Sequence, residues 1–204
     1  MTLLLASNAI MSNPPFASRY APGRAVYRAE FGLGDTGNLV GNPTAAGEGL
    51  TVGQFEGTAN GLAVASGKVV RGSNTSAGFV GLAAPGNGGT MVWRVDALPT
   101  AGGIYFDLFR DSGGNAYRIE LVGSTARLCV RVGGALTYLG AAFTVAAGDI
   151  VGIRWVGGKL FAYLNRSIAT QGLTNALPPG GQHGVAWTAP ATGFQLDSLE
   201  VDEY

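Results

Sequence analysis

The sequence predicts an all-β protein built as a two-sheet antiparallel jelly-roll sandwich. Three observations predict this fold class. Short β-rich runs recur along the chain, Gly, Asn, Asp or Pro residues separate them, and no long amphipathic helix lies between them. With 204 residues, 47% of them hydrophobic, the chain is long enough to bury a sizeable core. We therefore predict a single β-sandwich domain over residues 25–204.

The segment before the sandwich, residues 1–24, shows neither strand nor helix periodicity, and prolines interrupt it. We predict an extended N-terminal arm there. Its apolar side chains are too many for a solvated tail, so we expect the arm to attach the protein to a partner. The candidate attachment residues are Leu3, Leu4, Leu5, Ile10, Phe16 and Tyr20.

Within the sandwich, short β-rich runs bounded by turn residues are the predicted strands. They are residues 25–31, 61–66, 68–71, 78–83, 90–98, 104–110, 116–122, 127–132, 149–156, 159–165, 184–187 and 194–202. Residues 36–60 are Gly-rich and are expected to form loops with short edge strands.

The turn at Gly157-Gly158 predicts one hairpin register, because both glycines can adopt positive φ in a two-residue loop. This register pairs Trp155 with Leu160, Ile153 with Ala162 and Val151 with Leu164 on a core face. On the other face it pairs Arg154 with Phe161 and Gly152 with Tyr163.

Two further turns predict the next registers. A two-residue loop at Gly113-Gly114 pairs Leu108 with Ile119 and Phe106 with Leu121. The connection at residues 123–126 pairs Leu121 with Leu128, Ile119 with Val130 and Tyr117 with Val132. All three strands then agree on which side is buried, since a one-residue slip would invert every assignment.

Charge and hydropathy exclude several function classes. The 13 basic and 13 acidic residues are scattered, so there is no basic stripe for nucleic acid. No continuous apolar run reaches the roughly 20 residues of a membrane span. The start lacks the basic region of a signal peptide, and Cys129 has no second cysteine to pair with, so we expect synthesis in a cytoplasm without export. A surface this poor in charge predicts coverage by partners, including a homo-oligomer.

The strand order carries a family resemblance. Residues 107–165 contain Asp-Leu-Phe-Arg-Asp, Tyr-Arg-Ile-Glu-Leu, Arg-Leu-Cys-Val-Arg-Val, Gly-Asp-Ile-Val-Gly-Ile-Arg-Trp and Lys-Leu-Phe-Ala-Tyr-Leu-Asn, and the chain closes with Gly-Phe-Gln-Leu-Asp-Ser-Leu-Glu-Val. This succession resembles the concanavalin A-like lectin/glucanase superfamily, including laminin-G-like modules. Such modules occur in glycan-binding proteins, laminarinase-type glycosidases and bacteriophage virion proteins.

The unexported start, the arm and the Gly/Ala-rich sandwich look most like the bacteriophage case. The resemblance therefore implies a non-enzymatic virion structural protein, a capsid decoration or a tail or baseplate component. It would be made in the host bacterial cytoplasm and would assemble with other virion proteins. The alternative is a carbohydrate-binding, lectin-like module that recognises host surface glycans. Neither prediction involves a cofactor.

Catalysis is not predicted. Glycosidases of the superfamily that this chain resembles carry Glu-x-Asp-x-x-Glu on one strand, and that motif is absent from this sequence. The predicted register instead places Asp107 opposite Glu120 on the outer face. Arg118, Arg131 and Arg127 lie beside this pair, an arrangement more typical of a solvated or partner-facing surface.

The candidate binding face comprises Arg154, Phe161, Tyr163, Arg118 and Arg131. An aromatic ring beside arginine on an exposed sheet can stack on a sugar or anchor a protein partner. The alternative for Tyr163 is that it only covers the bare Gly152 opposite.

Four other features receive structural interpretations. Residues 32–37 match Gly-x-Gly-x-x-Gly, but Pro43 and further glycines exclude the helix that a dinucleotide site needs. His183, the only histidine, is expected in a loop or at a strand edge, and Cys129 is expected to be a weakly exposed structural thiol. Residues 111–115 could supply oxygens to Ca²⁺, but a turn is the preferred interpretation, so no metal site is predicted.

Overall fold

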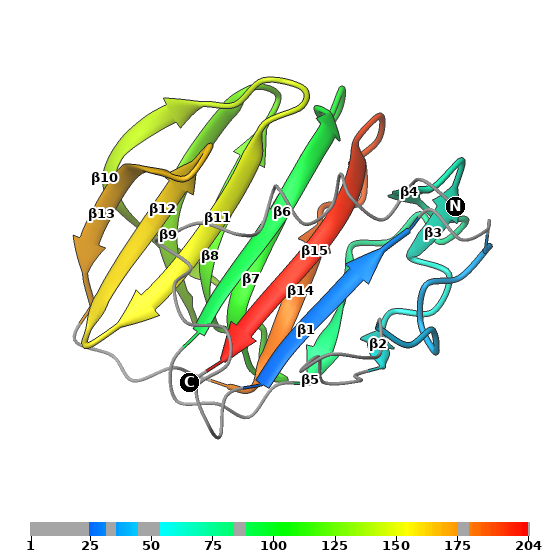
Figure 1. The fold of residues 1–204 in the computed structure, drawn as a ribbon, viewed down its shortest axis with the longest axis horizontal. Helices are drawn as coiled ribbons and strands as arrows, with labels where there is room; N and C mark the ends of the chain where they lie inside the picture. The colour runs from blue at the N-terminus through cyan, green and yellow to red at the C-terminus, as the bar shows by residue number, and fades with distance from the viewer. Residues whose placement is uncertain (1–24, 32–35, 45–53, 84–88, 175–179, 204) are drawn as a thin grey trace, which may run out of the picture.

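Two antiparallel sheets pack face to face in a computed structural model of the chain (Figure 1). The structure describes residues 25–31, 36–44, 54–83, 89–174 and 180–203. The predicted attachment arm, residues 1–24, and residues 32–35 of the glycine motif lie outside these residues. The predicted all-β sandwich is confirmed. No helix long and apolar enough to cross a bilayer occurs in the described ranges.

The first sheet is eight-stranded, in the order β13-β12-β11-β6-β15-β4-β3, with β1 paired alongside β15. Its strands are β1 (Ala25–Glu30), β3 (Leu62–Ala65), β4 (Lys68–Arg71), β6 (Gly89–Ala97), β11 (Ile150–Val156), β12 (Lys159–Leu164), β13 (Ser167–Leu173) and β15 (Gln195–Glu203). The last strand of the chain, β15, thus lies between β6 and β1, two strands that are distant from it in the sequence (Figure 1).

The second sheet is seven-stranded, in the order β10-β9-β8-β7-β14-β5-β2. Its strands are β2 (Phe55–Gly57), β5 (Gly78–Ala83), β7 (Gly103–Arg110), β8 (Ala116–Val122), β9 (Thr125–Val132), β10 (Ala135–Thr144) and β14 (Gln182–Trp187). β7, β8, β9 and β10 follow one another as a meander, so alternate residues of these four strands share one continuous outer surface.

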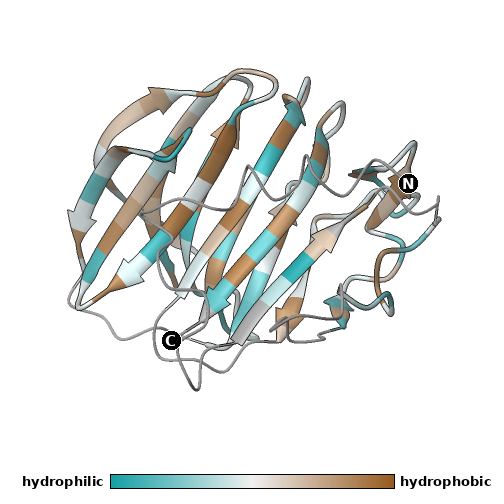
Figure 2. Ribbon diagram, in the orientation of Figure 1, coloured by the Kyte–Doolittle hydropathy of each residue, from teal (hydrophilic) through white to brown (hydrophobic). Residues whose placement is uncertain are grey.

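The core lies between the sheets, and hydropathy alternates along the strands as a half-buried sheet requires (Figure 2). Trp93 of the eight-stranded sheet stacks on Phe31 at 6.3 Å between ring centroids. The same Trp93 meets Phe106 of the seven-stranded sheet at 6.3 Å. These large rings account for much of the apolar area that holds the two layers together.

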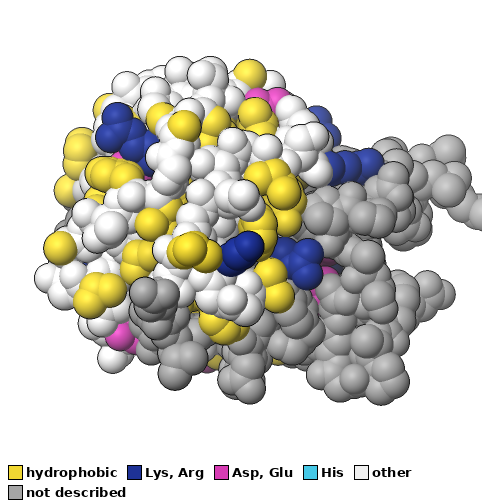
Figure 3. All heavy atoms as spheres, turned by 90° about the vertical axis from the view of Figure 1, so that its left-hand side faces the viewer, with side chains coloured by type: hydrophobic (Ala, Val, Ile, Leu, Met, Phe, Trp, Pro, Cys, Tyr) yellow, Lys and Arg dark blue, Asp and Glu magenta, His cyan; other side chains and the backbone are white. Residues whose placement is uncertain are grey.

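Each predicted strand is present, but β10 and β13 were missed. Both are edge strands, one in each sheet, and they lie against each other to close one side of the sandwich (Figure 1). Most of their residues are exposed, so their sequences show no clear alternation of apolar and polar residues. Seen from that side, hydrophobic side chains are dispersed among uncharged atoms and charged groups are few (Figure 3).

The predicted β11–β12 register is confirmed in all five pairs. Gly157 and Gly158 take φ of 56° and 79°, as a two-residue hairpin loop requires. Ile153, Val151, Leu160 and Ala162 are buried in the core, whereas Trp155 and Leu164 are half-buried and pack against it.

The predicted registers of β7–β8 and β8–β9 are wrong by two residues. Leu108 pairs with Tyr117 and Ile119 pairs with Leu128. Two features together shift the first register: β7 carries an extra residue near Phe109, whose φ is 56°, where it bulges against β14, and the following turn is one residue longer than predicted, since the Asp111 N–H donates to the Asn115 carbonyl oxygen. The second register shifts because its turn has only two residues. A shift of two keeps every side chain on its predicted face, so the buried face was still identified correctly, except that Val132 is 58% exposed.

Candidate binding face on the seven-stranded sheet

Two rows of polar and aromatic residues cross the outer surface of β7, β8, β9 and β10. The strand registers line up Asp107, Arg118, Cys129 and Tyr138 in one row. The second row is Tyr105, Glu120 and Arg127. We call these seven residues the β7–β10 face. At about 4.8 Å per strand, the first row extends about 14 Å.

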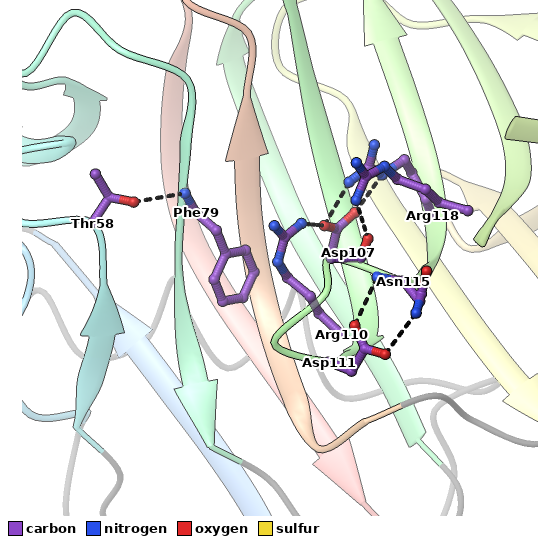
Figure 4. A network of polar contacts seen from close by, with 9 residues as sticks. Thr58, Phe79, Asp107, Arg110, Asp111, Asn115 and Arg118 are labelled. Atoms are coloured by element: carbon purple, nitrogen blue, oxygen red, sulfur yellow. Dashed lines mark hydrogen bonds and ion pairs between the residues drawn. The ribbon is translucent and has the colours of Figure 1, made fainter. Parts of the chain in front are cut away.

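Asp107 is the centre of a hydrogen-bonded network on this face (Figure 4). Arg118 donates from Nε to Oδ1 at 2.6 Å and from Nη2 to Oδ2 at 2.8 Å. Arg110 donates from Nη1 to Oδ2 at 2.6 Å. The Asp107 side chain is 0% exposed and that of Arg118 is 5% exposed. The predicted pairing of Asp107 with Glu120 is therefore wrong: the two-residue register shift puts Arg118 opposite Asp107.

The two arginines held by Asp107 also lie over aromatic rings. Arg118 lies 4.2 Å from the ring centroid of Tyr105, and Arg110 lies 4.7 Å from that of Phe79. Burial by itself would lower the pKa of Arg118, but the hydrogen bonds to Asp107 outweigh it and raise that pKa. Burial, followed by the nearby Glu120 charge, raises the pKa of Tyr105. The centre of the face is thus rigid and already charge-compensated before any ligand binds.

The accessible aromatic ring of the face is Tyr138, which is 45% exposed. Its hydroxyl donates to Glu120 Oε2 at 2.8 Å, and Arg127 lies 5.1 Å from its ring centroid. The hydrogen bond to Glu120, with burial as a smaller cause, raises the pKa of Tyr138. Tyr138 was not among the predicted binding residues because it lies on β10, a strand that was not predicted. The Gly133-Gly134 pair before it, at φ of 57° and 87°, was the available hairpin signal.

Arg131 supports the turn between β7 and β8 by donating to the carbonyl oxygen of Gly114. In that turn Asn115 donates to the Asp111 carboxylate from its backbone N at 2.8 Å and from Nδ2 at 2.7 Å. Burial opposes the effect, but these hydrogen bonds lower the pKa of Asp111. The predicted turn is confirmed. The described residues include no cluster of three or more metal-ligating side chains.

The five residues predicted as one binding face lie on opposite sides of the sandwich. Arg118 and Arg131 face outward from the seven-stranded sheet, whereas Arg154, Phe161 and Tyr163 face outward from the eight-stranded sheet. They therefore cannot form one continuous surface. Tyr163 pairs with Gly152 and is only 4% exposed, which favours the interpretation that it covers this glycine.

His183 is not in a loop or at a strand edge, as was predicted, but is fully buried on β14 in the interior of its sheet. Its Nδ1 accepts a hydrogen bond from the backbone N of Phe109 at 3.1 Å, and the two rings meet edge-on at 4.7 Å. The imidazole therefore supports the strained bulge residue, a structural task that no local sequence signal could reveal.

Cys129 is also more buried than predicted: it is fully buried and pairs with Arg118 of β8. Burial raises the pKa of its thiol to about 12, which makes it a poor nucleophile.

This raised pKa predicts a specific loss of stability at alkaline pH. Between pH 9 and 12 the unfolded thiol ionises and the folded one does not, so the free energy of unfolding falls as pH rises, by about 1.4 kcal/mol per pH unit. Cys129→Ala should lack the part of this alkaline loss of stability that comes from the thiol. The check is the urea midpoint of both proteins at pH 8, 10 and 11; a constant difference between them would contradict the prediction.

Comparison with known proteins identifies the fold. No protein-family model matches the sequence, and no curated protein sequence does. Among solved structures, the VIP36 exoplasmic/lumenal domain bound to Ca²⁺ and Man2 aligns with a TM-score of 0.58 at 13% identity, covering 87% of this chain and 88% of that one. The chain has the concanavalin A-like jelly-roll fold.

Two other solved structures also align with this chain. The carbohydrate-binding module CBM66 from Bacillus subtilis aligns with a TM-score of 0.50 at 15% identity, covering 62% of this chain and 84% of that one. LamA from Zobellia galactanivorans, in complex with laminaritriose and laminaritetraose, aligns with a TM-score of 0.51 at 10% identity, covering 71% and 82%. At these identities the likeness concerns the fold alone.

Proposed function

We propose that this protein is a non-enzymatic carbohydrate-binding module that binds glycans on the β7–β10 face. The observation that carries the proposal is the exposed Tyr138 ring, whose hydroxyl is held by Glu120 at 2.8 Å beside Arg127. A sugar presents apolar C–H faces and a rim of hydroxyls, so an exposed ring flanked by fixed donors and acceptors matches both.

Preorganisation supports the same site. The side chains beside Tyr138 are already ordered, since Asp107 holds Arg118 and Arg118 lies over Tyr105. Binding therefore costs little additional side-chain entropy. The accessible part of the face is Tyr138 with Arg127 beside it, and Glu120 and Tyr105 are partly exposed.

The names of the fold neighbours point the same way. CBM66 is a carbohydrate-binding module, and VIP36 has been solved with mannose-containing ligands. These neighbours support the carbohydrate-binding alternative better than the bacteriophage virion role. That role, with its virion location and protein partners, stays a prediction from the family resemblance, and finding the protein in purified particles by mass spectrometry would test it.

The test of glycan binding uses matched aromatic substitutions on the two outer faces. On an array of immobilised glycans, Tyr138→Ala should reduce binding of the best ligand by at least about tenfold, since truncating an anchoring tyrosine costs about 2 kcal/mol or more. Phe161→Ala, on the eight-stranded sheet, should leave binding unchanged.

Two outcomes would contradict this assignment. Loss of binding in Phe161→Ala with none in Tyr138→Ala would move the site to the other sheet. No binding to any glycan by the full chain would remove the proposed function itself.

The absence of hydrolysis is a separate prediction. Both oxygens of Asp107 accept hydrogen bonds from arginine, so this carboxylate acts as an anchor for Arg110 and Arg118. Glu120 then has no carboxylate partner opposite it, because Tyr105 and Arg127 flank it on the adjacent strands. We expect no release of reducing sugar from laminarin. Release that disappears in Glu120→Gln would show the prediction to be wrong.

A further inference from the structure

A group of arginines lies at one end of the β7–β10 face, beside the turn between β7 and β8. Arg110 of β7 and Arg131 of β9 lie at this turn, and Arg118 of β8 shares the Asp107 carboxylate with Arg110. Figure 4 shows Arg110 and Arg118 converging on the same carboxylate, that of Asp107.

Among the described residues, Asp107 is the one carboxylate that forms ion pairs with these arginines. Asp107 is shared by two of the three guanidinium groups. Asp111, the next carboxylate, is engaged by Asn115. Glu120 accepts from Tyr138, and Cys129 is protonated at neutral pH because its pKa is about 12. Among the described residues, the polar partner of Arg131 is a neutral carbonyl, that of Gly114.

The geometry brings two of these cations together. A Cβ placed on Gly114 would touch Nη1 of Arg131 and would lie 3.0 Å from Nη2 of Arg110, so the two guanidinium groups are neighbours across this glycine. Both side chains are partly accessible: Arg110 is 19% exposed, and Arg131 is of intermediate exposure. Neighbouring like charges repel, and an anion placed between them would relieve the repulsion and accept charge-assisted hydrogen bonds.

We propose that Arg110 and Arg131 form a subsite for the carboxylate or sulfate group of an acidic saccharide. The inference rests on the proposed function and narrows its substrate class. Arg131 lies two residues from Cys129 on β9, and Cys129 pairs with Tyr138, so the subsite lies about 7 Å along the strands from the Tyr138 row. One sugar chain can therefore stack on Tyr138 and present its anion to the arginine pair.

The experiment measures binding of the full chain by affinity electrophoresis in gels containing alginate, dextran sulfate or neutral laminarin. We expect tighter binding to at least one acidic polymer than to laminarin, and weaker acidic binding as NaCl is raised. Alginate tests a carboxylate and dextran sulfate tests a sulfate ester. Arg131→Gln should weaken acidic binding by about tenfold or more, the effect of one lost charge-assisted pair, without changing laminarin binding.

Two further variants make the result interpretable. Arg131→Lys keeps the charge and should retain most of the acidic binding, even if the turn is loosened. Arg154→Gln removes one positive charge from the opposite sheet and should have no effect. Equal losses in Arg131→Gln and Arg154→Gln would show a general effect of net charge and would overturn the subsite.

The failure of this inference differs from the failure of the proposed function. Binding to laminarin that depends on Tyr138, with no preference for either acidic polymer, would overturn the arginine subsite and leave glycan binding intact. Absence of binding to all three polymers and to the glycan array would overturn both.

Discussion

Replacing Asp107 with alanine is expected to destabilise the protein by about 3–5 kcal/mol, the cost of leaving a buried charge without its partner. Asp107 and Arg118 are 0% and 5% exposed, and two hydrogen bonds of 2.6 and 2.8 Å join them. Without the carboxylate, the Arg118 guanidinium stays buried over the Tyr105 ring and loses the ion pair that compensates its charge. Urea unfolding of the two proteins measures the difference.

Two controls separate this mechanism from a general loss of contacts on the outer face. Glu120→Ala removes a more accessible carboxylate from the same surface and should cost no more than about 1 kcal/mol. Adding Arg118→Met to Asp107→Ala removes the orphaned charge and should restore part of the lost stability. If the double variant is less stable than Asp107→Ala alone, the buried charge is not the cause.

Replacing His183 with alanine is the second substitution with a large expected effect, also about 3–5 kcal/mol. The substitution opens a cavity at a fully buried position and removes the acceptor of the Phe109 backbone N–H. Phe109 holds φ of 56° with a bulky side chain, so it depends on this support. Its ring packs against Tyr117 and Trp155 as well, which spreads the disturbance between both sheets.

The measurement pairs urea unfolding with hydrogen exchange of the Phe109 amide. His183→Asn places an amide oxygen near the position of Nδ1 and should preserve part of the exchange protection, whereas His183→Ala should lose it. Equal protection of this amide in the wild type and in His183→Ala would show that the imidazole does not hold the bulge.

The fold was largely predictable because burial of one sheet face leaves a period of two in the sequence. Ile153, Leu160 and Ala162 were placed correctly in the core by that alternation and by the Gly157-Gly158 turn. The edge strands β10 and β13 were not predicted because their mostly exposed residues do not alternate in this way. Tyr138, which now carries the proposed function, was missed with them.

The local sequence pattern could not predict which residues pair across neighbouring strands. Alternation places Asp107 and Arg118 on one face but is unchanged by a shift of two residues, and the bulge at Phe109 together with the length of the following turn sets the shift. That bulge depends in turn on His183, which is 74 residues away in the chain. The identity of the buried face follows from the sequence alone, because the alternation of apolar and polar residues that marks it is complete within a few residues. The pairing of charges on the outer face follows from long-range packing, because the contacts that define the register join distant parts of the chain.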